Sequence, residues 1–185
     1  MGAFLTEKVR LEQTGKTRVF RILDNELYQD DDEVIYIVPR YMQTDNYTIP
    51  LWISTIGGSP VDYRLEPSHL HDLACYSFSV IYVNLTKEEL IMKGFYRYSK
   101  NRELWVCENI PKEFLKVKSV TKMQANSLLY RAMKAAKVPF FKRWIVRIGV
   151  AFNIGWFIKK WKKLEVPIDL DRIYDKDFWD FVEGK

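Results

Sequence analysis

Residues 34–39 read Val-Ile-Tyr-Ile-Val-Pro, and this stretch decides the class of the fold. A run of β-branched and aromatic residues is typical of a buried strand. Pro39 ends the strand or places it at a sheet edge, because proline cannot donate to a strand ladder. On its N-terminal side, residues 17–23 alternate enough to predict another strand, and Leu27 and Tyr28 begin a return strand after the turn signal Asp24-Asn25.

Beyond the strand, the pattern changes from strands to helices. Residues 78–85 predict one more strand, Thr86 and Glu89 form a capping box that opens a short helix, and residues 94–109 fit a loop or a hairpin. From residue 119 apolar residues recur every three or four positions, which predicts a helix over 119–137: Val120, Met123, Leu128, Leu129, Ala132, Met133 and Ala136.

Pro139 breaks this periodicity, and a second helix is expected over 141–162. Ser68 is a suitable N-cap for a shorter helix over 69–77. Strands followed by helices predict an α+β fold, in which helices from the C-terminal half cover a small, mostly antiparallel sheet from the N-terminal half. At 185 residues, the chain fits a single domain over 1–163 followed by an acidic, aromatic tail over 164–185.

Charge is distributed unevenly along the chain. Residues 111–163 hold 14 basic residues and one acidic residue, whereas the tail holds three basic and seven acidic residues. The basic block could bind a polyanion, or it could be neutralised by the tail or by a partner subunit.

Several functional classes are excluded. Two cysteines without a Cys-x-x-Cys pair exclude a disulfide scaffold and a cysteine zinc ribbon, and two histidines cannot build a three-histidine metal centre. The sequence contains no Gly-x-Gly-x-x-Gly, no Walker-type Gly-Lys-Ser/Thr and no Gly-x-Ser-x-Gly elbow. We expect neither a signal peptide nor a transmembrane helix.

The segment His69-Leu70-His71-Asp72 is the first candidate for chemistry. On a helix His69 and Asp72 share a face and His71 points elsewhere, so a metal would need distant oxygens from Asp45, Asp62 or Glu66. The alternative is a structural role, in which the histidines hold a helix end and a loop by hydrogen bonds. His71 and Cys75, four residues apart, could pair as base and nucleophile, although a small buried cysteine is the commoner case.

Two further segments allow more than one interpretation. The loop containing Asp45, residues 44–50, is typical of a turn rich in side-chain hydrogen bonds, and a catalytic carboxylate is the alternative. The basic helix carries Trp144, Trp156 and Trp161, which fit a core with a solvated basic face, a nucleic-acid surface or a membrane surface. Its candidate polyanion-binding residues are Lys142, Arg143, Arg147, Lys159, Lys160, Lys162 and Lys163.

The order of these motifs resembles a small family of uncharacterised bacteriophage and prophage proteins. That family has a strand leading into Val-Pro, a Thr-Asp-Gly-x-Ser-x-Pro loop, a helix that starts with His-Asp, and a later helix with Ala-Asp, an aromatic residue and Ala-Met. The counterparts here are Val38-Pro39, the loop 44–50, the pair His71-Asp72, and a helix with Ala125-Asn126, Tyr130 and Ala132-Met133. The resemblance covers about residues 17–158, with 78–118 as an insertion that it covers poorly.

The resemblance implies that a loop aspartate, the His-Asp pair and a helix aspartate converge on one site. Here that set is Asp45, His71 and Asp72 as catalytic candidates, with Thr44 and Asn126 in a polar network. Two positions depart from the family: Asn46 replaces the loop glycine, and Asn126 replaces the helix aspartate. An amide binds metal weakly and cannot act as a general base, so an enzymatic site in this copy would be degenerate.

Three functional hypotheses follow. The first is a phage-type protein that acts through protein–protein contacts, as a virion or assembly component or as a host-interaction factor. The second is a hydrolase that uses the Asp45, His71 and Asp72 cluster, without a cofactor or with a divalent metal. The third is a polyanion binder, with nucleic acid preferred over a membrane surface. The expected location is the virion or the host cytoplasm.

Overall fold

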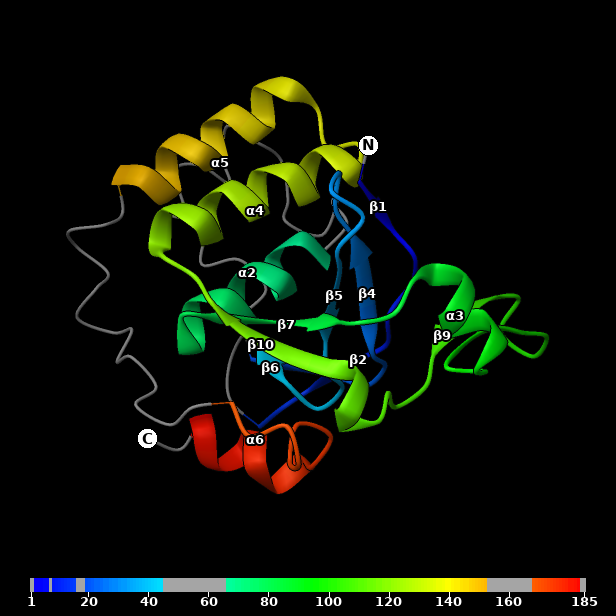
Figure 1. Ribbon diagram of the computed structural model, residues 1–185. Coiled ribbons are helices and arrows are strands. Elements are labelled where there is room, and N and C mark those ends of the chain that lie inside the picture. The colour runs from blue at the N-terminus through cyan, green and yellow to red at the C-terminus, as the bar shows by residue number, and fades with distance from the viewer. Residues whose placement is uncertain (1, 7, 16–18, 45–65, 153–167, 184–185) are drawn as a thin grey trace.

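The computed structural model describes residues 2–6, 8–15, 19–44, 66–152 and 168–183. Its centre is an antiparallel sheet of five strands in the order β1-β4-β5-β7-β10, covered on one side by helices (Figure 1). The strands are β1 (Ala3–Phe4), β4 (Glu26–Gln29), β5 (Ile35–Val38), β7 (Ser79–Val83) and β10 (Leu115–Ser119). The fold class is therefore α+β, as the sequence predicts.

Two small antiparallel sheets flank the central one. The strands β2 (Leu11–Gln13), β3 (Phe20–Ile22) and β6 (Gln43–Thr44) form the first, in the order β2-β3-β6. The strands β8 (Tyr96–Ser99) and β9 (Leu104–Cys107) form the second, which is a hairpin.

The helices are stacked in layers away from the central sheet. Helix α2 (Glu66–Ser77) packs on β7 and β5, α4 (Lys122–Ala135) packs on α2, and α5 (Phe140–Phe152) packs on α4 (Figure 1). The main core lies between the sheet and α2 and includes Ile37, Leu70, Leu73, Ile81 and Ala132. No helix in the described ranges has the length and apolar character needed to cross a membrane.

Local sequence signals account for several boundaries. Both Thr86 and Thr121 are N-caps with a complete capping box, so α3 (Lys87–Met92) and α4 begin where their side chains satisfy free backbone N–H groups. The proline break is also confirmed, because Pro139 separates α4 from α5. Of the second predicted helix, 140–152 is helical and 153–162 lies outside the described residues.

Two predictions are wrong. Ser68 is not an N-cap, because α2 already begins at Glu66 and Pro67 lies in its first turn, where a missing N–H costs nothing. The expected elements also omit β10, which pairs with β7 from Leu115 to Ser119, although residues 115–118 alternate apolar and basic residues as strands do. Its Lys-Val-Lys centre is polar because β10 is an edge strand, and lysines discourage further pairing at an edge.

The C-terminal segment docks on the domain itself. Helix α6 (Lys176–Glu183) lies against β6, at the opposite end of the molecule from α5 (Figure 1). Ile173, Phe178 and Trp179 are buried, and the Asp180 carboxylate accepts hydrogen bonds from Arg21 and Gln43. Part of the negative charge of the tail is thus neutralised by the small β2-β3-β6 sheet.

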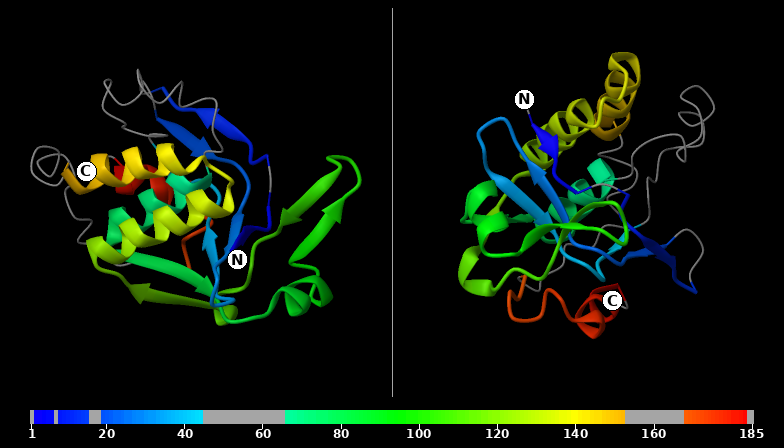
Figure 2. Two further views of the ribbon diagram at one scale, coloured as in Figure 1. Left: turned by 90° about the horizontal axis from the view of Figure 1, so that it is seen from above. Right: turned by 90° about the vertical axis from the view of Figure 1, so that its right-hand side faces the viewer.

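Residues 86–108, here called the arm, project from the body as α3 and the β8–β9 hairpin (Figure 2, left). Three contacts tie the arm to the N-terminal part of the chain. The Tyr96 hydroxyl donates to the Leu5 carbonyl at 2.6 Å, and the Asn25 amide donates to the Glu108 carbonyl at 2.9 Å. Arg102 and Asp24 form a two-pronged ion pair with both distances at 2.9 Å.

Candidate functional site

Helix α2 presents polar side chains on two different faces, as the spacing of its histidines predicts. His69 and Asp72 are three residues apart and are buried toward the strands, whereas His71 and Cys75 are four apart and face α4. The two histidines therefore belong to separate networks, and they do not form one site.

A buried acid–base pair lies between α2 and the central sheet. The Nδ1 atom of His69 is 2.5 Å from Oε1 of Glu26, the first residue of β4, and each side chain is only 1% exposed. In the described part of the chain, the second oxygen of Glu26 is buried and has no hydrogen-bond partner. The sequence analysis did not single out Glu26. A carboxylate at the start of a strand with buried neighbours indicates a charged group that needs a partner.

The two members of this pair hold their protons more tightly than in the unfolded chain. Burial raises the pKa of Glu26; His69 opposes this effect and the Glu66 carboxyl adds to it. Burial by itself lowers the pKa of His69, but Glu26, Asp72 and Glu66 outweigh it, so the net shift is upward. The pKa of Glu26 is raised chiefly by burial, whereas the pKa of His69 is raised because neighbouring carboxyl groups outweigh burial.

Asp72 connects this cluster to β6. The Thr44 hydroxyl donates to Oδ2 of Asp72 at 2.5 Å, and both residues are buried. Gln43, the neighbour of Thr44, donates to Asp180 of α6, so the C-terminal helix holds the strand that carries Thr44. The predicted catalytic residue Asp45 lies outside the described residues.

The second face of α2 brings together His71, Cys75 and Asn126. The Nε2 atom of His71 lies 3.1 Å from Oδ1 of Asn126, a residue of α4, and 3.4 Å from Sγ of Cys75. The Sγ atom of Cys75 also lies 4.0 Å from Nδ1 of His71, so the thiol is within contact distance of both ring nitrogens. Burial, aided by Asp72, raises the pKa of Cys75 to about 12, which keeps the thiol protonated at neutral pH.

This geometry limits the chemistry of the described part of the site. Across residues 2–6, 8–15, 19–44, 66–152 and 168–183, no three His, Cys, Asp or Glu side chains are arranged to hold a metal ion. Asn126 accepts a hydrogen bond or donates one, but it supplies neither a base nor a charged ligand. The contacts Thr44–Asp72 and His71–Asn126 fix the relative positions of β6, α2 and α4.

A comparison with protein families identifies the family of this chain. Residues 20–150 match the family described as "Protein of unknown function (DUF1353)", which is more than two thirds of the chain. The chain belongs to the DUF1353 family. No curated protein and no solved structure matches it.

The DUF1353 match includes both faces of α2 and their partners. Glu26, Thr44, His69, His71 and Asn126 all lie between residues 20 and 150, whereas α6 lies beyond the matched region. The match also runs across 78–118, the stretch interpreted above as an insertion. This stretch contributes β7 and β10 to the central sheet, and the arm lies between them.

The basic residues of the DUF1353 domain are only partly described. Arg143 and Arg147 of α5 both place their guanidinium groups over the Tyr130 ring of α4, at 5.3 and 5.4 Å from its centroid. These cation–π contacts pack α5 on α4 without a carboxylate. Four of the predicted polyanion-binding residues, Lys159, Lys160, Lys162 and Lys163, fall outside the described residues.

Proposed function

We propose that this protein acts by binding a partner protein through the outer face of the arm. One observation carries the proposal: a preorganised hairpin exposes a continuous aromatic face. Trp105 stacks on the Tyr96 ring at a centroid distance of 4.7 Å and meets the Tyr98 ring edge-on at 6.1 Å. Tyr96 is buried at the base of the arm, whereas Tyr98 and Trp105 are exposed.

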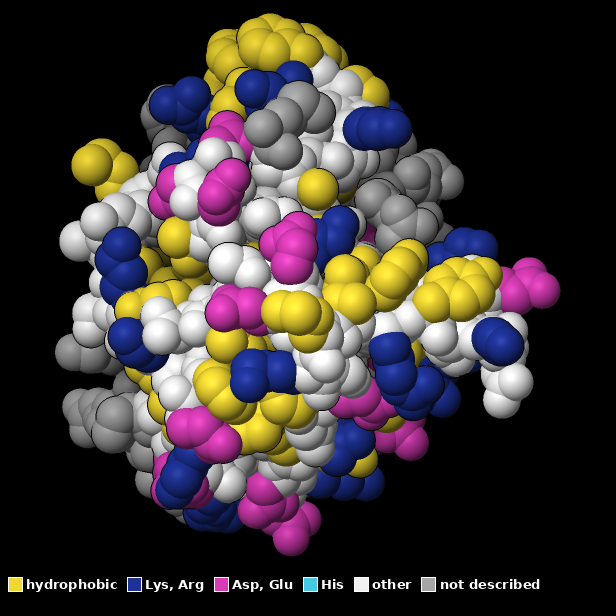
Figure 3. Space-filling model, turned by 45° about the vertical axis from the view of Figure 1, so that its right-hand side comes forward, with side chains coloured by type: hydrophobic (Ala, Val, Ile, Leu, Met, Phe, Trp, Pro, Cys, Tyr) yellow, Lys and Arg dark blue, Asp and Glu magenta, His cyan; other side chains and the backbone are white. Residues whose placement is uncertain are grey.

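The apolar surface continues from the hairpin onto α3. Ile91 and Met92 are both exposed, and Figure 3 shows hydrophobic side chains running out along the arm on the right. Tyrosine, tryptophan and methionine are enriched at the cores of protein interfaces, and tyrosine and tryptophan cost little side-chain entropy when they become ordered. This composition favours a protein partner.

The contacts that hold the arm on the body of the domain also support the proposed role in partner binding. The contacts of Tyr96 with Leu5 and of Arg102 with Asp24 hold the hairpin in position before any partner arrives. A binding surface that is already ordered avoids much of the entropy cost of association. The body of the domain therefore serves as a support for the arm.

The resemblance to bacteriophage and prophage proteins suggests the class of partner. We infer that the partner is either a structural protein of the particle or a host protein. Quantitative mass spectrometry of purified particles separates the two. A fixed ratio of this chain to the capsid protein supports a virion or assembly component, and its absence from particles supports a host-interaction factor.

The arm itself is tested by a pair of matched variants. A double variant with Tyr98→Ser and Trp105→Ser removes the exposed rings, while Trp144→Ser removes an exposed tryptophan elsewhere on the surface. A partner captured by the unmodified protein should bind the purified chain in a two-component titration. We expect the arm variant to weaken this affinity at least tenfold, as for hot-spot residues, and Trp144→Ser to leave it unchanged. Equal weakening by both variants would contradict the proposal.

The hydrolase hypothesis retains one supporting contact. Thr44 bonds to Asp72, and Asp45 is the next residue along the chain after Thr44. If Asp45 is catalytic, Asp45→Asn should abolish a hydrolytic activity while the circular dichroism spectrum stays unchanged. Near-stoichiometric metal in the purified protein would support a metal-dependent form of the same hypothesis.

A further inference from the structure

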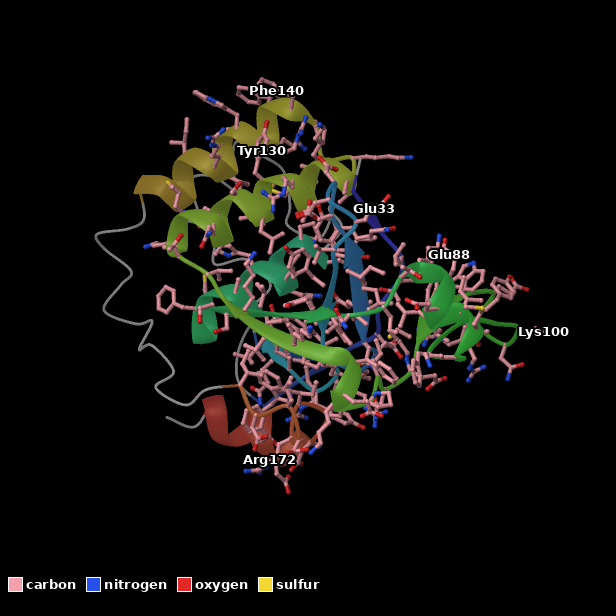
Figure 4. The ribbon with its side chains drawn as sticks, viewed as in Figure 1. Glu33, Glu88, Lys100, Tyr130, Phe140 and Arg172 are labelled. Carbon is pink, nitrogen blue, oxygen red and sulfur yellow. The ribbon has the colours of Figure 1, made fainter. Side chains whose placement is uncertain are left out.

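Helix α5 exposes an aromatic tip that the core does not use. Phe140, Phe141 and Trp144 are 66%, 61% and 51% exposed, and they cluster at the first turns of the helix. Figure 3 shows hydrophobic side chains gathered at the top of the molecule with lysine and arginine beside them, and Figure 4 labels Phe140 at this place. We call these three residues the α5 tip.

The two helices at this end of the molecule carry charge of one sign. Residues 122–152, which span α4 and α5, contain seven lysines and arginines and no aspartate or glutamate. Arg131 is neutralised by Asp30, whereas Arg143 lies over the rings of Tyr130 and Phe140, at 5.3 and 5.7 Å. Cation–π stacking leaves the positive charge of Arg143 in place beside the exposed aromatics.

The acidic turn between β4 and β5 does not reach the tip. Its Glu33 lies below both Tyr130 and Phe140 in Figure 4, and the contact of this turn with α4 is the buried pair of Asp30 with Arg131. The end of the molecule that carries the α5 tip thus combines exposed aromatic rings with basic side chains.

We propose that the α5 tip docks this protein on a membrane surface that contains anionic lipids. Exposed phenylalanine and tryptophan side chains enter the boundary between headgroups and acyl chains, and arginine and lysine beside them meet the anionic headgroups. Such a helix binds in the plane of the surface without crossing the bilayer, which fits the absence of a spanning helix in the described ranges.

The contacts at the tip favour a membrane over a nucleic acid. Single-stranded nucleic acid needs free aromatic faces along a basic groove. Here the guanidinium groups of Arg143 and Arg147 cover the ring of Tyr130, and the tip stands at the convex top of the molecule (Figure 3). A convex tip with three protruding rings fits a membrane surface better than it fits a strand of nucleic acid.

The test is sedimentation of the full-length protein with vesicles. One set contains only phosphatidylcholine, and the other contains roughly a third phosphatidylglycerol, which supplies the negative surface potential. We expect at least tenfold tighter binding to the anionic vesicles, and this preference should shrink as salt is raised. Replacing Arg147 by glutamine should weaken binding by about fivefold, the usual contribution of one basic residue near such a surface.

Matched variants distinguish binding through the α5 tip from nonspecific binding by exposed aromatic side chains. The triple change Phe140→Ser, Phe141→Ser and Trp144→Ser should lower anionic vesicle binding at least tenfold, with an unchanged circular dichroism spectrum. The arm variant Tyr98→Ser with Trp105→Ser removes two exposed rings from a different surface and should bind vesicles like the unmodified protein. Absent binding, equal binding to both vesicle types, or equal losses in the two variants would overturn the proposal. One further result would overturn it. In this case vesicles do not bind, whereas a single-stranded DNA oligonucleotide binds in an anisotropy assay and the triple change abolishes that binding.

Discussion

The pair of Glu26 and His69 makes a sharp prediction about stability. Each side chain is only 1% exposed, so water can neither replace a lost partner nor screen the interaction between the two groups. Replacing Glu26 by alanine leaves the imidazole buried without its carboxyl partner, and such a loss costs about 3–5 kcal/mol. Glu26→Gln keeps the volume and the hydrogen-bond acceptor, so we expect a smaller loss of about 1–3 kcal/mol.

The same pair determines the direction of a pH dependence. The pKa values of His69 and Glu26 are both raised on folding from ordinary values of 6.5 and 4.5. The folded chain therefore binds more protons, and the stability from this pair is present at low pH and is lost as pH rises through the folded pKa values. For one proton the slope is at most about 1.4 kcal/mol per pH unit.

Urea unfolding between about pH 6 and pH 7.5 measures this effect, because the ordinary pKa values of cysteine and tyrosine lie above that window. The free energy of unfolding of the unmodified protein should fall across the window. The Glu26→Gln variant should show a flatter profile, and a double-mutant cycle with His69→Gln should give a coupling energy of more than about 1 kcal/mol. Identical pH profiles in the unmodified protein and Glu26→Gln would refute this account of the cluster.

Three further predictions test other parts of the structure. Arg131→Ala should cost about 2–3 kcal/mol in urea unfolding, less than a fully buried pair, because Asp30 is buried but Arg131 is 39% exposed; a loss below about 0.5 kcal/mol would show that the pair contributes little. Asp180→Ala removes the ion pair with Arg21 and should make the C-terminal segment the first site of limited proteolysis, whereas an unchanged cleavage pattern would mean that apolar burial alone holds α6. Because its pKa is raised to about 12, Cys75 should react slowly with a thiol reagent at pH 8 and fast after unfolding, as followed by peptide mass spectrometry; fast reaction of the folded protein would restore the nucleophile hypothesis.

Much of the secondary structure is determined within short stretches of the sequence. The capping boxes at Thr86 and Thr121 form between residues three apart, and Pro139, which has no N–H, lies between the end of α4 and the start of α5. The strand at 35–38 follows from its β-branched and aromatic residues. The separation of His69 from His71 also follows from helix geometry, because neighbours on a helix are three or four residues apart.

The site and its surroundings are decided by contacts that no local pattern encodes. Glu26 meets His69 across 43 positions in the chain, and Gln43 meets Asp180 across 137. Strand β10 alternates apolar and basic residues as strands do, but its place in the sheet is decided by β7, which offers a free edge for its backbone. The sequence by itself determined most of the helices, the buried strand at 35–38 and the α+β class, because these depend on propensities and on hydrogen bonds between near neighbours. Only the tertiary structure decided which carboxyl faces which histidine and which aromatic residues stay exposed, because burial and pairing depend on how distant elements pack.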